Sequence, residues 1–391
     1  MSSPLARAGL IRCGDRVGLD SHRMHRARLG LCALVAAVVA ALSLMAATGS
    51  AEKTGTYLSS LHSITTIAST VPRNGDLNPY GIVIVPRTTG ALTAGDFLVS
   101  NFNAKSHNQG TGSTIVQISP AGKLSVFARI TAHALPGACP GGIGLTNALG
   151  VLPHGYVVVG SLPTTNGRPV TARHGCLIVL NRAGRAVETI KGPDIEGPWG
   201  MATVTRGATT TLFVTNTLSG GTDAGLWIVP TATVVRIRLT TSGGAPRATS
   251  QKTIVAAIPW IDDKAALVIG PTGLALGAND TLYVADTLGN RIIAVPHAMT
   301  RRRAVPDRNI TLTAGRDLSE PLGLTIAPNG DIITTNAGNG NIVETTPSGK
   351  QVATVAGDAQ SGAGSLFGLA ITSSNALVYV DDGLNTLRML S

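Results

Sequence analysis

The sequence predicts an all-β fold, a six-bladed β-propeller with four-stranded antiparallel blades. Short apolar runs bounded by Gly, Asn and Asp recur along the chain, and this pattern indicates short strands joined by tight turns. The pattern of residues 270–295 can be laid down six times, and such recurrence is typical of propellers. The sixth copy lacks its fourth strand, whereas residues 63–71 resemble the closing strands of other copies. We therefore expect the N-terminal strand to complete the last blade and close the ring, which leaves only short sheet edges.

The composition fits one large β-sheet domain. Of the 391 residues, 43% are hydrophobic and only 13% are charged, so a sizeable core can be buried. The formal net charge is +10, and the basic residues are scattered apart from Arg301, Arg302 and Arg303. A diffuse excess of this kind does not indicate a nucleic-acid-binding protein. We expect a monomer that has no nucleic-acid partner.

The N-terminal segment, residues 1–51, has the pattern of a secretory signal peptide. Arg23, Arg26 and Arg28 precede an uncharged apolar run over residues 29–45, and small residues follow, with Gly49 and Ala51 placed for cleavage after Ala51. The apolar run is also long enough for an N-terminal anchor that is kept. The propeller is expected over residues 52–391, in a secreted, periplasmic or cell-envelope protein with no membrane span beyond this leader.

The six copies can be followed in order, each with four expected strands, except that the last copy borrows its fourth. The expected strands are, blade by blade, residues 79–85, 97–101, 113–118 and 123–128; 148–151, 156–160, 176–180 and 186–190; 198–201, 212–216, 225–229 and 252–256; 274–276, 282–285, 291–295 and 309–314; 321–324, 331–336, 341–345 and 350–356; 366–369, 377–381 and 386–390, completed by 63–71.

The fourth copy resembles a known repeat. Leu-Tyr-Val-Ala-Asp-Thr-Leu-Gly-Asn-Arg-Ile at 282–292, preceded by Pro-Thr-Gly at 271–273, is similar to the NHL repeat found in many propellers, and residues 336–342 and 381–385 match it less closely. The resemblance implies an architecture and no particular chemistry. Gly81, Gly200, Gly273 and Gly323 are interpreted as tight-turn residues. Asp and Asn side chains bond backbone groups in turns, so we assign that role to Asp286, Asn290, Asn336, Asn341, Asp381 and Asn385.

Two cysteines are expected to form a disulfide. Cys139 lies in the loop before the first strand of the second blade, and Cys176 follows the long hairpin of residues 161–175 in the same blade. In an antiparallel blade these two loops lie on one face. Cys139 and Cys176 are the only cysteines after the leader, and such a pair in an oxidising compartment is usually bonded.

Metal-binding patterns are weak. His107, His133 and His174 are expected on the face of the long loops, where three imidazoles could hold zinc, but their spacing is not that of metal ligands. Gluconolactonase-like and paraoxonase-like propellers hold calcium with Glu, Asn and Asp where the blades begin. Calcium needs about six to eight oxygen ligands, and the residues before the first-strand glycines are mostly apolar here. We therefore expect no metal or cofactor, with calcium or zinc as the alternative; the weaker oxygen candidates are Asn78, Asn147, Glu196 and Glu320.

The six residues that precede the first-strand glycines are expected to form a ring around the central axis. They are Tyr80, Leu149, Trp199, Thr272, Leu322 and Phe367. One interpretation is that they plug the central channel, because closed β structures fill their interiors with side chains. The other is that they line an apolar pocket or a peptide-binding mouth, where aromatic side chains act as anchors.

The sequence identifies no catalytic residue, since it has no nucleophile elbow, paired-metal spacing or phosphate loop. The main hypothesis is a secreted or envelope binding or scaffold module. It would bind a protein, a peptide or a small molecule through the long loops of residues 101–112, 131–147 and 161–175, since recognition usually lies on loops held by a rigid scaffold. The alternative is a metal-dependent hydrolase or lyase of the gluconolactonase-like type.

Overall fold

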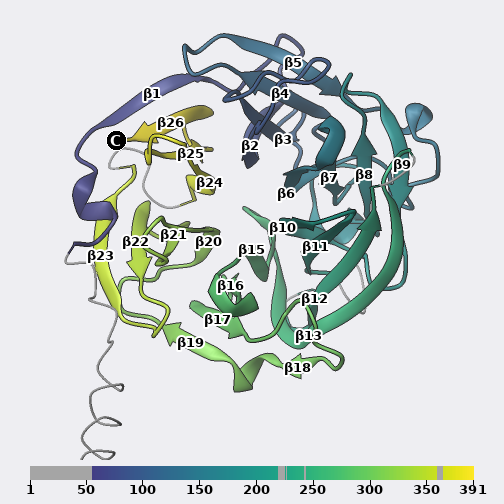
Figure 1. Ribbon diagram of the computed structural model, residues 1–391. Coiled ribbons are helices and arrows are strands. Elements are labelled where there is room, and N and C mark those ends of the chain that lie inside the picture. Colours follow the sequence, from purple (N-terminus) through teal and green to yellow (C-terminus); the bar gives the residue numbers. More distant parts are fainter. Residues whose placement is uncertain (1–54, 219–224, 226, 242–243, 359–363) are drawn as a thin grey trace, which may run out of the picture. The chain divides into compact units, whose positions relative to one another are not determined.

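Six antiparallel sheets stand around a central axis in residues 55–391, as the sequence predicts (Figure 1). The computed structural model describes residues 55–218, 225, 227–241, 244–358 and 364–391. The chain divides into one unit of residues 1–54 and a second of residues 55–391. The predicted leader lies outside the described residues. Among those that are described, no helix has the length and apolar character needed to cross a membrane.

The strands follow the expected order. Blade 1 holds β2 (Leu77–Ile84), β3 (Phe97–Asn103), β4 (Thr114–Ile118) and β5 (Leu124–Arg129); blade 2 holds β6 (Leu145–Val151), β7 (Val157–Ser161), β8 (Cys176–Leu180) and β9 (Ala186–Ile190); blade 3 holds β10 (Pro198–Arg206), β11 (Thr209–Asn216), β12 (Val229–Thr240), β13 (Arg247–Asp263) and β14 (Leu267–Ile269), with β18 (Val305–Pro306) added beside β13.

Blades 4 to 6 are more regular. Blade 4 holds β15 (Pro271–Leu276), β16 (Leu282–Asp286), β17 (Arg291–Val295) and β19 (Thr311–Ala314); blade 5 holds β20 (Pro321–Ile326), β21 (Ile332–Asn336), β22 (Asn341–Thr345) and β23 (Gln351–Ala356); blade 6 holds β24 (Leu366–Ile371), β25 (Leu377–Asp381), β26 (Thr386–Leu390) and β1 (Ile64–Ser69). Short 3₁₀ helices lie between strands: η1 (Leu58–Ser60), η2 (Ala132–Ala134), η3 (Pro153–Gly155), η4 (Pro169–Thr171), η5 (Ala278–Asp280) and η6 (Asp307–Asn309).

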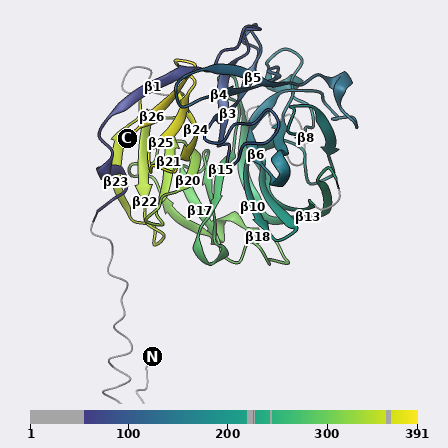
Figure 2. The ribbon, with the colours of Figure 1, turned by 45° about the horizontal axis from the view of Figure 1, so that its top comes forward.

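The N-terminal strand closes the ring, which confirms the prediction. β1 pairs antiparallel with β26, from Ile64 opposite Leu390 to Ser69 opposite Thr386, and lies on the outer side of the ring (Figures 1 and 2). A second contact holds η1 to the neighbouring blade 5. The buried carboxylate of Glu344 accepts hydrogen bonds from the backbone N–H groups of Tyr57 and Leu58, both at 2.8 Å.

The third blade departs from prediction. Its third strand was expected at residues 225–229 but begins at Val229, and Trp227 and Ile228 before it are 81% and 61% exposed. The next stretch alternates β-branched residues with polar ones, and it pairs with β11 over eight positions, from Thr209 opposite Thr240 to Asn216 opposite Thr233. That pairing buries Val234, Val235, Ile237 and Leu239, so packing favours the later strand over the short apolar run.

The glycines of the innermost strands do not serve tight turns, contrary to prediction. Gly81, Gly200, Gly273 and Gly323 lie inside β2, β10, β15 and β20, and none of them has positive φ. A Cβ on each would meet the backbone of the next blade, with the Asn147, Thr272, Leu322 and Phe367 carbonyl oxygens as the respective contacts. The glycines are needed because neighbouring first strands approach closely around the axis.

Candidate ligand pocket at the channel mouth

Three aromatic side chains fill the centre of the ring. Tyr80, Trp199 and Phe367 come from equivalent places on β2, β10 and β24, and all three are buried. The Tyr80 ring stacks on Phe367 and on Phe102 at centroid distances of 4.0 and 4.7 Å. Trp199 meets Tyr80 edge-on at 5.6 Å. Contacts of this geometry fix the rings against one another, so they form a rigid apolar floor.

A cavity of about 340 Å³ lies over this floor. Of the six predicted ring residues, five line it: Tyr80, Trp199, Thr272, Leu322 and Phe367. Leu149 is also buried but packs into the separate apolar cluster between blades 1 and 2. The two interpretations of the ring therefore describe one arrangement, since the aromatic residues fill the channel and also line a cavity above it.

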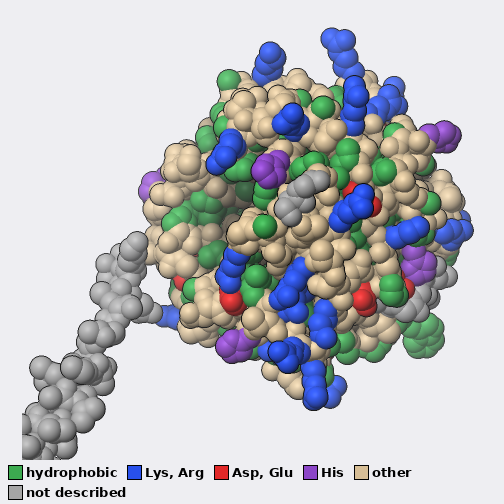
Figure 3. Space-filling view, turned by 45° about the vertical axis from the view of Figure 1, so that its right-hand side comes forward, with side chains coloured by type: hydrophobic (Ala, Val, Ile, Leu, Met, Phe, Trp, Pro, Cys, Tyr) green, Lys and Arg blue, Asp and Glu red, His purple; other side chains and the backbone are tan. Residues whose placement is uncertain are grey.

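Three carboxyl groups complete the lining of the cavity. They belong to Asp263, Glu320 and Asp382, and no Lys, Arg or His is among the described lining residues. The chain has a net charge of +10, and this local excess of acid contrasts with the face seen in Figure 3, where Lys and Arg side chains are spread widely. The cavity thus has an apolar aromatic floor and an acidic wall.

Asp263 reaches the cavity on a hairpin that the sequence analysis did not identify. The second half of β13 turns back as β14, with Ile261 opposite Ile269 and Asp263 opposite Leu267. The Asp263 carboxylate accepts hydrogen bonds from the backbone N–H groups of Ala265 and Ala266 at 2.7 and 2.6 Å, which shapes the turn. Two apolar runs around Asp-Asp-Lys at 262–264 are a hairpin signal that could have located it.

Asp382 lies directly after β25, beside the turn residue Asp381. With its amide nitrogen facing the carboxyl group, the buried Asn78 donates to Asp382 at 2.6 Å and accepts from Asn103 at 3.0 Å. Burial raises the pKa of Asp382 to about 7, and the negative charge of Asp381 adds to the shift. The carboxyl group therefore changes charge near neutral pH.

Tyr80 is held in its neutral form. Burial raises the pKa of its phenol well above the usual value, and the charges of Asp382 and Asp263 push the pKa in the same direction. Both carboxyl groups line the same cavity as Tyr80. The floor of the cavity accordingly keeps a hydroxyl group rather than a phenolate near these acids.

Two of the predicted turn residues hold the acidic wall in place. Asn290 accepts a hydrogen bond from the backbone N–H of Glu320 at 2.9 Å, and Asn385 accepts one from the backbone N–H of Asn78 at 2.7 Å. Glu320 and Asn78 both have positive φ, at 51° and 63°; Glu320 directly precedes β20, and Asn78 is the second residue of β2. The repeat asparagine of one blade therefore fixes the start of the next blade.

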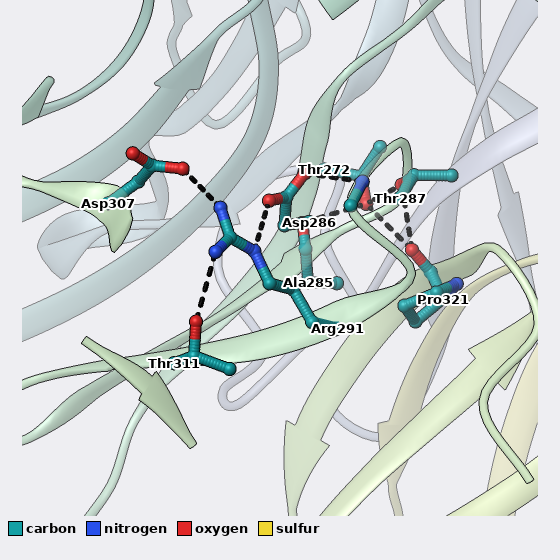
Figure 4. Close-up of polar contacts among 9 residues, drawn as sticks. Thr272, Ala285, Asp286, Thr287, Arg291, Asp307, Thr311 and Pro321 are labelled. Carbon is teal, nitrogen blue, oxygen red and sulfur yellow. Dashed lines mark hydrogen bonds and ion pairs between the residues drawn. The ribbon is translucent and has the colours of Figure 1, made fainter. Parts of the chain in front are cut away.

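The other repeat polar residues also bond locally. Asn336 donates to the Asp317 carbonyl oxygen at 2.7 Å, the backbone of Asn341 donates to Asn339, and Asp381 accepts from the Leu384 N–H at 3.1 Å. In blade 4, Asp286 is fully buried and pairs with Arg291 at 2.7 Å (Figure 4). The Arg291 guanidinium also contacts Asp307 and Thr311, so this polar group ties β16, β17 and the outer edge of the blade together.

The predicted oxygen ligands for calcium are not brought together. Glu196 pairs with His174 at 3.7 Å, and Asn78 is bonded to Asp382. The Asn147 side chain faces Gly368 of β24, and only Glu320 lines the cavity. In the described part of the chain, no three His, Cys, Asp or Glu side chains are grouped to hold a metal ion. This donor set does not fit calcium, which takes about six to eight oxygens.

The three candidate zinc histidines are likewise separate. His107 is exposed in a turn with φ of 63°, His133 is exposed in η2, and His174 faces Glu196. The predicted disulfide does form: Cys139 and Cys176 are bonded, with their Cα atoms 5.4 Å apart. It joins the loop before β6 to the start of β8, on the face predicted for both.

Comparisons with known proteins agree on the fold and go no further. No family profile matches the chain, and no curated protein is detectably similar in sequence, so the NHL resemblance stays a prediction. A putative gluconolactonase structure is 15% identical over 84% of this chain and 91% of its own, with a TM-score of 0.53. A gluconolactonase from Xanthomonas campestris is 16% identical over 82% and 87%, with a TM-score of 0.52. A calcium-binding regucalcin from Agrobacterium tumefaciens is 14% identical over 84% and 95%, also with a TM-score of 0.52. These structural similarities agree with the six-bladed propeller fold.

Proposed function

We propose that this propeller binds a small organic cation in the cavity at its channel mouth. The observation that carries the proposal is the meeting of three carboxyl groups with an aromatic floor, with no basic side chain among the described lining residues. Two kinds of attraction would act together on a ligand with a protonated amine. The partly buried Asp263 and Asp382 and the exposed Glu320 attract its charge, and the apolar floor packs against its hydrocarbon part.

The size of the cavity sets the kind of ligand. A volume of about 340 Å³ is at the lower end of small-molecule sites, so a single ring or a short chain bearing one amine fits better than a peptide. Benzylamine is a suitable probe because it joins an aromatic ring to one ammonium group. Benzyl alcohol and benzoate have nearly the same shape with no charge and with the opposite charge.

Calorimetric titration at pH 8 tests the proposal. We expect benzylamine to bind more tightly than benzyl alcohol and benzoate to show no binding, and Glu320→Gln and Asp382→Asn to weaken benzylamine binding by about tenfold each, since each removes one charge. Glu188→Gln, outside the cavity on β9, is the matched control and should bind like the native protein. Equal affinity for the amine and the alcohol would refute the proposal.

A second candidate function is hydrolysis or elimination with Asp382 as a general acid–base group. A pKa of about 7 is the observation that favours it, because proton transfer is most effective when the pKa is near the working pH. In lactone hydrolysis, ionised Asp382 would take a proton from a water molecule as the water oxygen attacks the carbonyl carbon. The ring C–O bond would then break, and the protonated Asp382 would give its proton to the leaving alkoxide. Gluconolactonases share this fold, so lactones are the first substrates to assay. Full turnover by Asp382→Asn would exclude this function.

We further propose that the protein works outside the cytoplasm. A disulfide between Cys139 and Cys176 supports this, because such bonds persist in oxidising compartments. The signal-peptide pattern of residues 1–51 points the same way. N-terminal sequencing of the exported protein would show whether cleavage follows Ala51.

A further inference from the structure

A second cavity, of about 560 Å³, opens where blades 1 and 2 meet. It lies between the β2–β3 hairpin and the β6–β7 hairpin. In an antiparallel blade these hairpins lie at the opposite end from the β3–β4 and β7–β8 loops and from the loops that lead into the blades. The cavity therefore belongs to the face of the ring opposite the channel-mouth pocket.

The lining of this cavity is basic, whereas the lining of the channel-mouth cavity is acidic. Arg87, His154 and Arg182 line it, from three different loops, and no Asp or Glu is among its described lining residues. Neither guanidinium takes part in an ion pair with the described part of the chain. Thr88, Thr89 and Thr205 add hydroxyl groups to the lining.

The loops that carry these groups are fixed to one another. The backbone N–H of Ala91 donates to the Arg182 carbonyl oxygen at 2.8 Å, so the β2–β3 hairpin is joined to the β8–β9 turn. Gly155 lies where an added Cβ would meet both Thr89 and Arg182, and its φ of 77° suits glycine. The backbone positions that carry these exposed side chains are therefore set before a ligand arrives, which lowers the cost of binding.

We propose that this cavity binds a phosphate-type oxyanion. Two guanidinium groups provide planar pairs of N–H donors that match phosphate oxygens, and the threonine hydroxyls can donate to the remaining oxygens. The cavity is larger than a phosphate ion, so the group recognised is the phosphate of a larger ester, either dissolved or in a lipid headgroup. The proposal does not depend on the channel-mouth pocket.

Inorganic phosphate is the first probe, with the full mature protein in a buffer of constant ionic strength. We expect a saturable rise in melting temperature with phosphate and none with chloride, since a ligand that binds the folded state alone stabilises it. The double variant Arg87→Ala/Arg182→Ala should lose at least tenfold in phosphate affinity. Arg308→Ala, an exposed arginine on η6, is the control and should keep it. Unchanged phosphate affinity in the double variant, or no saturable binding by the native protein, would overturn the proposal.

A second experiment distinguishes a lipid headgroup from a dissolved ester as the source of the phosphate. Vesicles that contain phosphatidic acid are compared with vesicles of neutral lipid in a sedimentation assay. Binding to the former that the double variant lacks identifies a lipid headgroup, whereas phosphate binding without vesicle binding identifies a dissolved ester. Vesicle binding that the double variant retains in full would contradict recognition by this cavity.

Discussion

Asp382 is partly buried and bonded to Asn78, and its pKa of about 7 is far above that of an ordinary aspartate. Burial dominates because it penalises the charged form, and the nearby negative charge of Asp381 adds to it. A cation in the cavity would act in the opposite direction, since it stabilises the ionised carboxylate. Ligand binding and the ionisation of this one group should therefore be coupled.

We accordingly predict that benzylamine binds more tightly as pH rises. Asp382 is mostly protonated at pH 6 and mostly ionised at pH 8, and the amine stays protonated throughout. If binding requires the ionised form, affinity should increase about tenfold over this range, in proportion to the ionised fraction of a group with pKa about 7. Titration calorimetry at several pH values measures this. Asp382→Asn should flatten the profile, and a native profile that is already flat would argue against the coupling.

At the scale of strands, the ring depends on close approach between neighbouring blades. Gly323 in β20 shows this most clearly, because a Cβ there would meet the carbonyl oxygen of Phe367 and the side chains of Leu369 and Thr335. The aromatic floor depends on the same spacing, since Phe367 itself stacks on Tyr80. Backbone contact at the glycine and ring contact at the floor are thus parts of one packing arrangement.

Gly323→Ala is therefore expected to destabilise the fold by about 1–3 kcal/mol, the usual cost of forcing extra atoms into a well-packed place. Gly137→Ala is the matched control, because an added Cβ there finds only Thr189 atoms at 3.7 and 4.0 Å. Urea unfolding of both variants gives the comparison. Equal stability of the two variants would show that the blades can separate slightly without cost.

The architecture could be predicted from the sequence because short apolar runs recur along the chain and repeat turn residues mark blades 4 to 6. Asp286, Asn290 and Asn385 mark equivalent hairpins, and the missing last strand has one obvious replacement at the N-terminus. The third blade was less predictable, since β12 and β13 are longer than the repeat and the β13–β14 hairpin has no counterpart among the described residues of the other copies. The apolar run at residues 225–229 ends where β12 begins, and apolar patterning alone could not show which of the two pairs with β11.

The pocket was only half predictable. Tyr80, Trp199 and Phe367 occupy equivalent repeat positions, so the sequence alone placed them around the axis. Asp263 comes from the additional hairpin, and Asp382 follows a repeat aspartate that is itself a turn residue. Their convergence on one cavity depends on distances across the ring, which spacing along the chain does not contain.

At the scale of the whole molecule, ring closure joins β1, the first described strand, to β26, the last. β1 pairs with β26, and Glu344 of blade 5 holds η1 through two backbone N–H groups and also accepts from the Asn329 amide at 2.8 Å. This carboxylate is fully buried, so the backbone N–H groups of Tyr57 and Leu58 would lose their acceptor without it. The stretch that holds η1 and β1 is thereby attached to two blades rather than one.

We predict that Glu344→Gln lowers the free energy of unfolding by about 1–3 kcal/mol, because one of its two oxygens becomes an amide that cannot accept a hydrogen bond from a buried N–H. Hydrogen exchange should also accelerate at Tyr57 and Leu58 before it does in the central strands. Glu188→Gln, a carboxylate that pairs at the surface with Arg247, serves as the control. A native-like exchange rate at Tyr57 in Glu344→Gln would show that the Glu344 contact does not hold η1 in place.

The central claim is that the channel mouth holds an organic cation between an aromatic floor and an acidic wall. Crystals of the mature protein soaked separately with 4-bromobenzylamine and 4-bromobenzoate test it most directly, because anomalous scattering locates the bromine. We predict a bromine peak over Tyr80 and Phe367 for the amine alone, with its nitrogen within hydrogen-bonding distance of Asp263, Glu320 or Asp382. An empty cavity in the amine soak, or the benzoate in the same place, would contradict the claim.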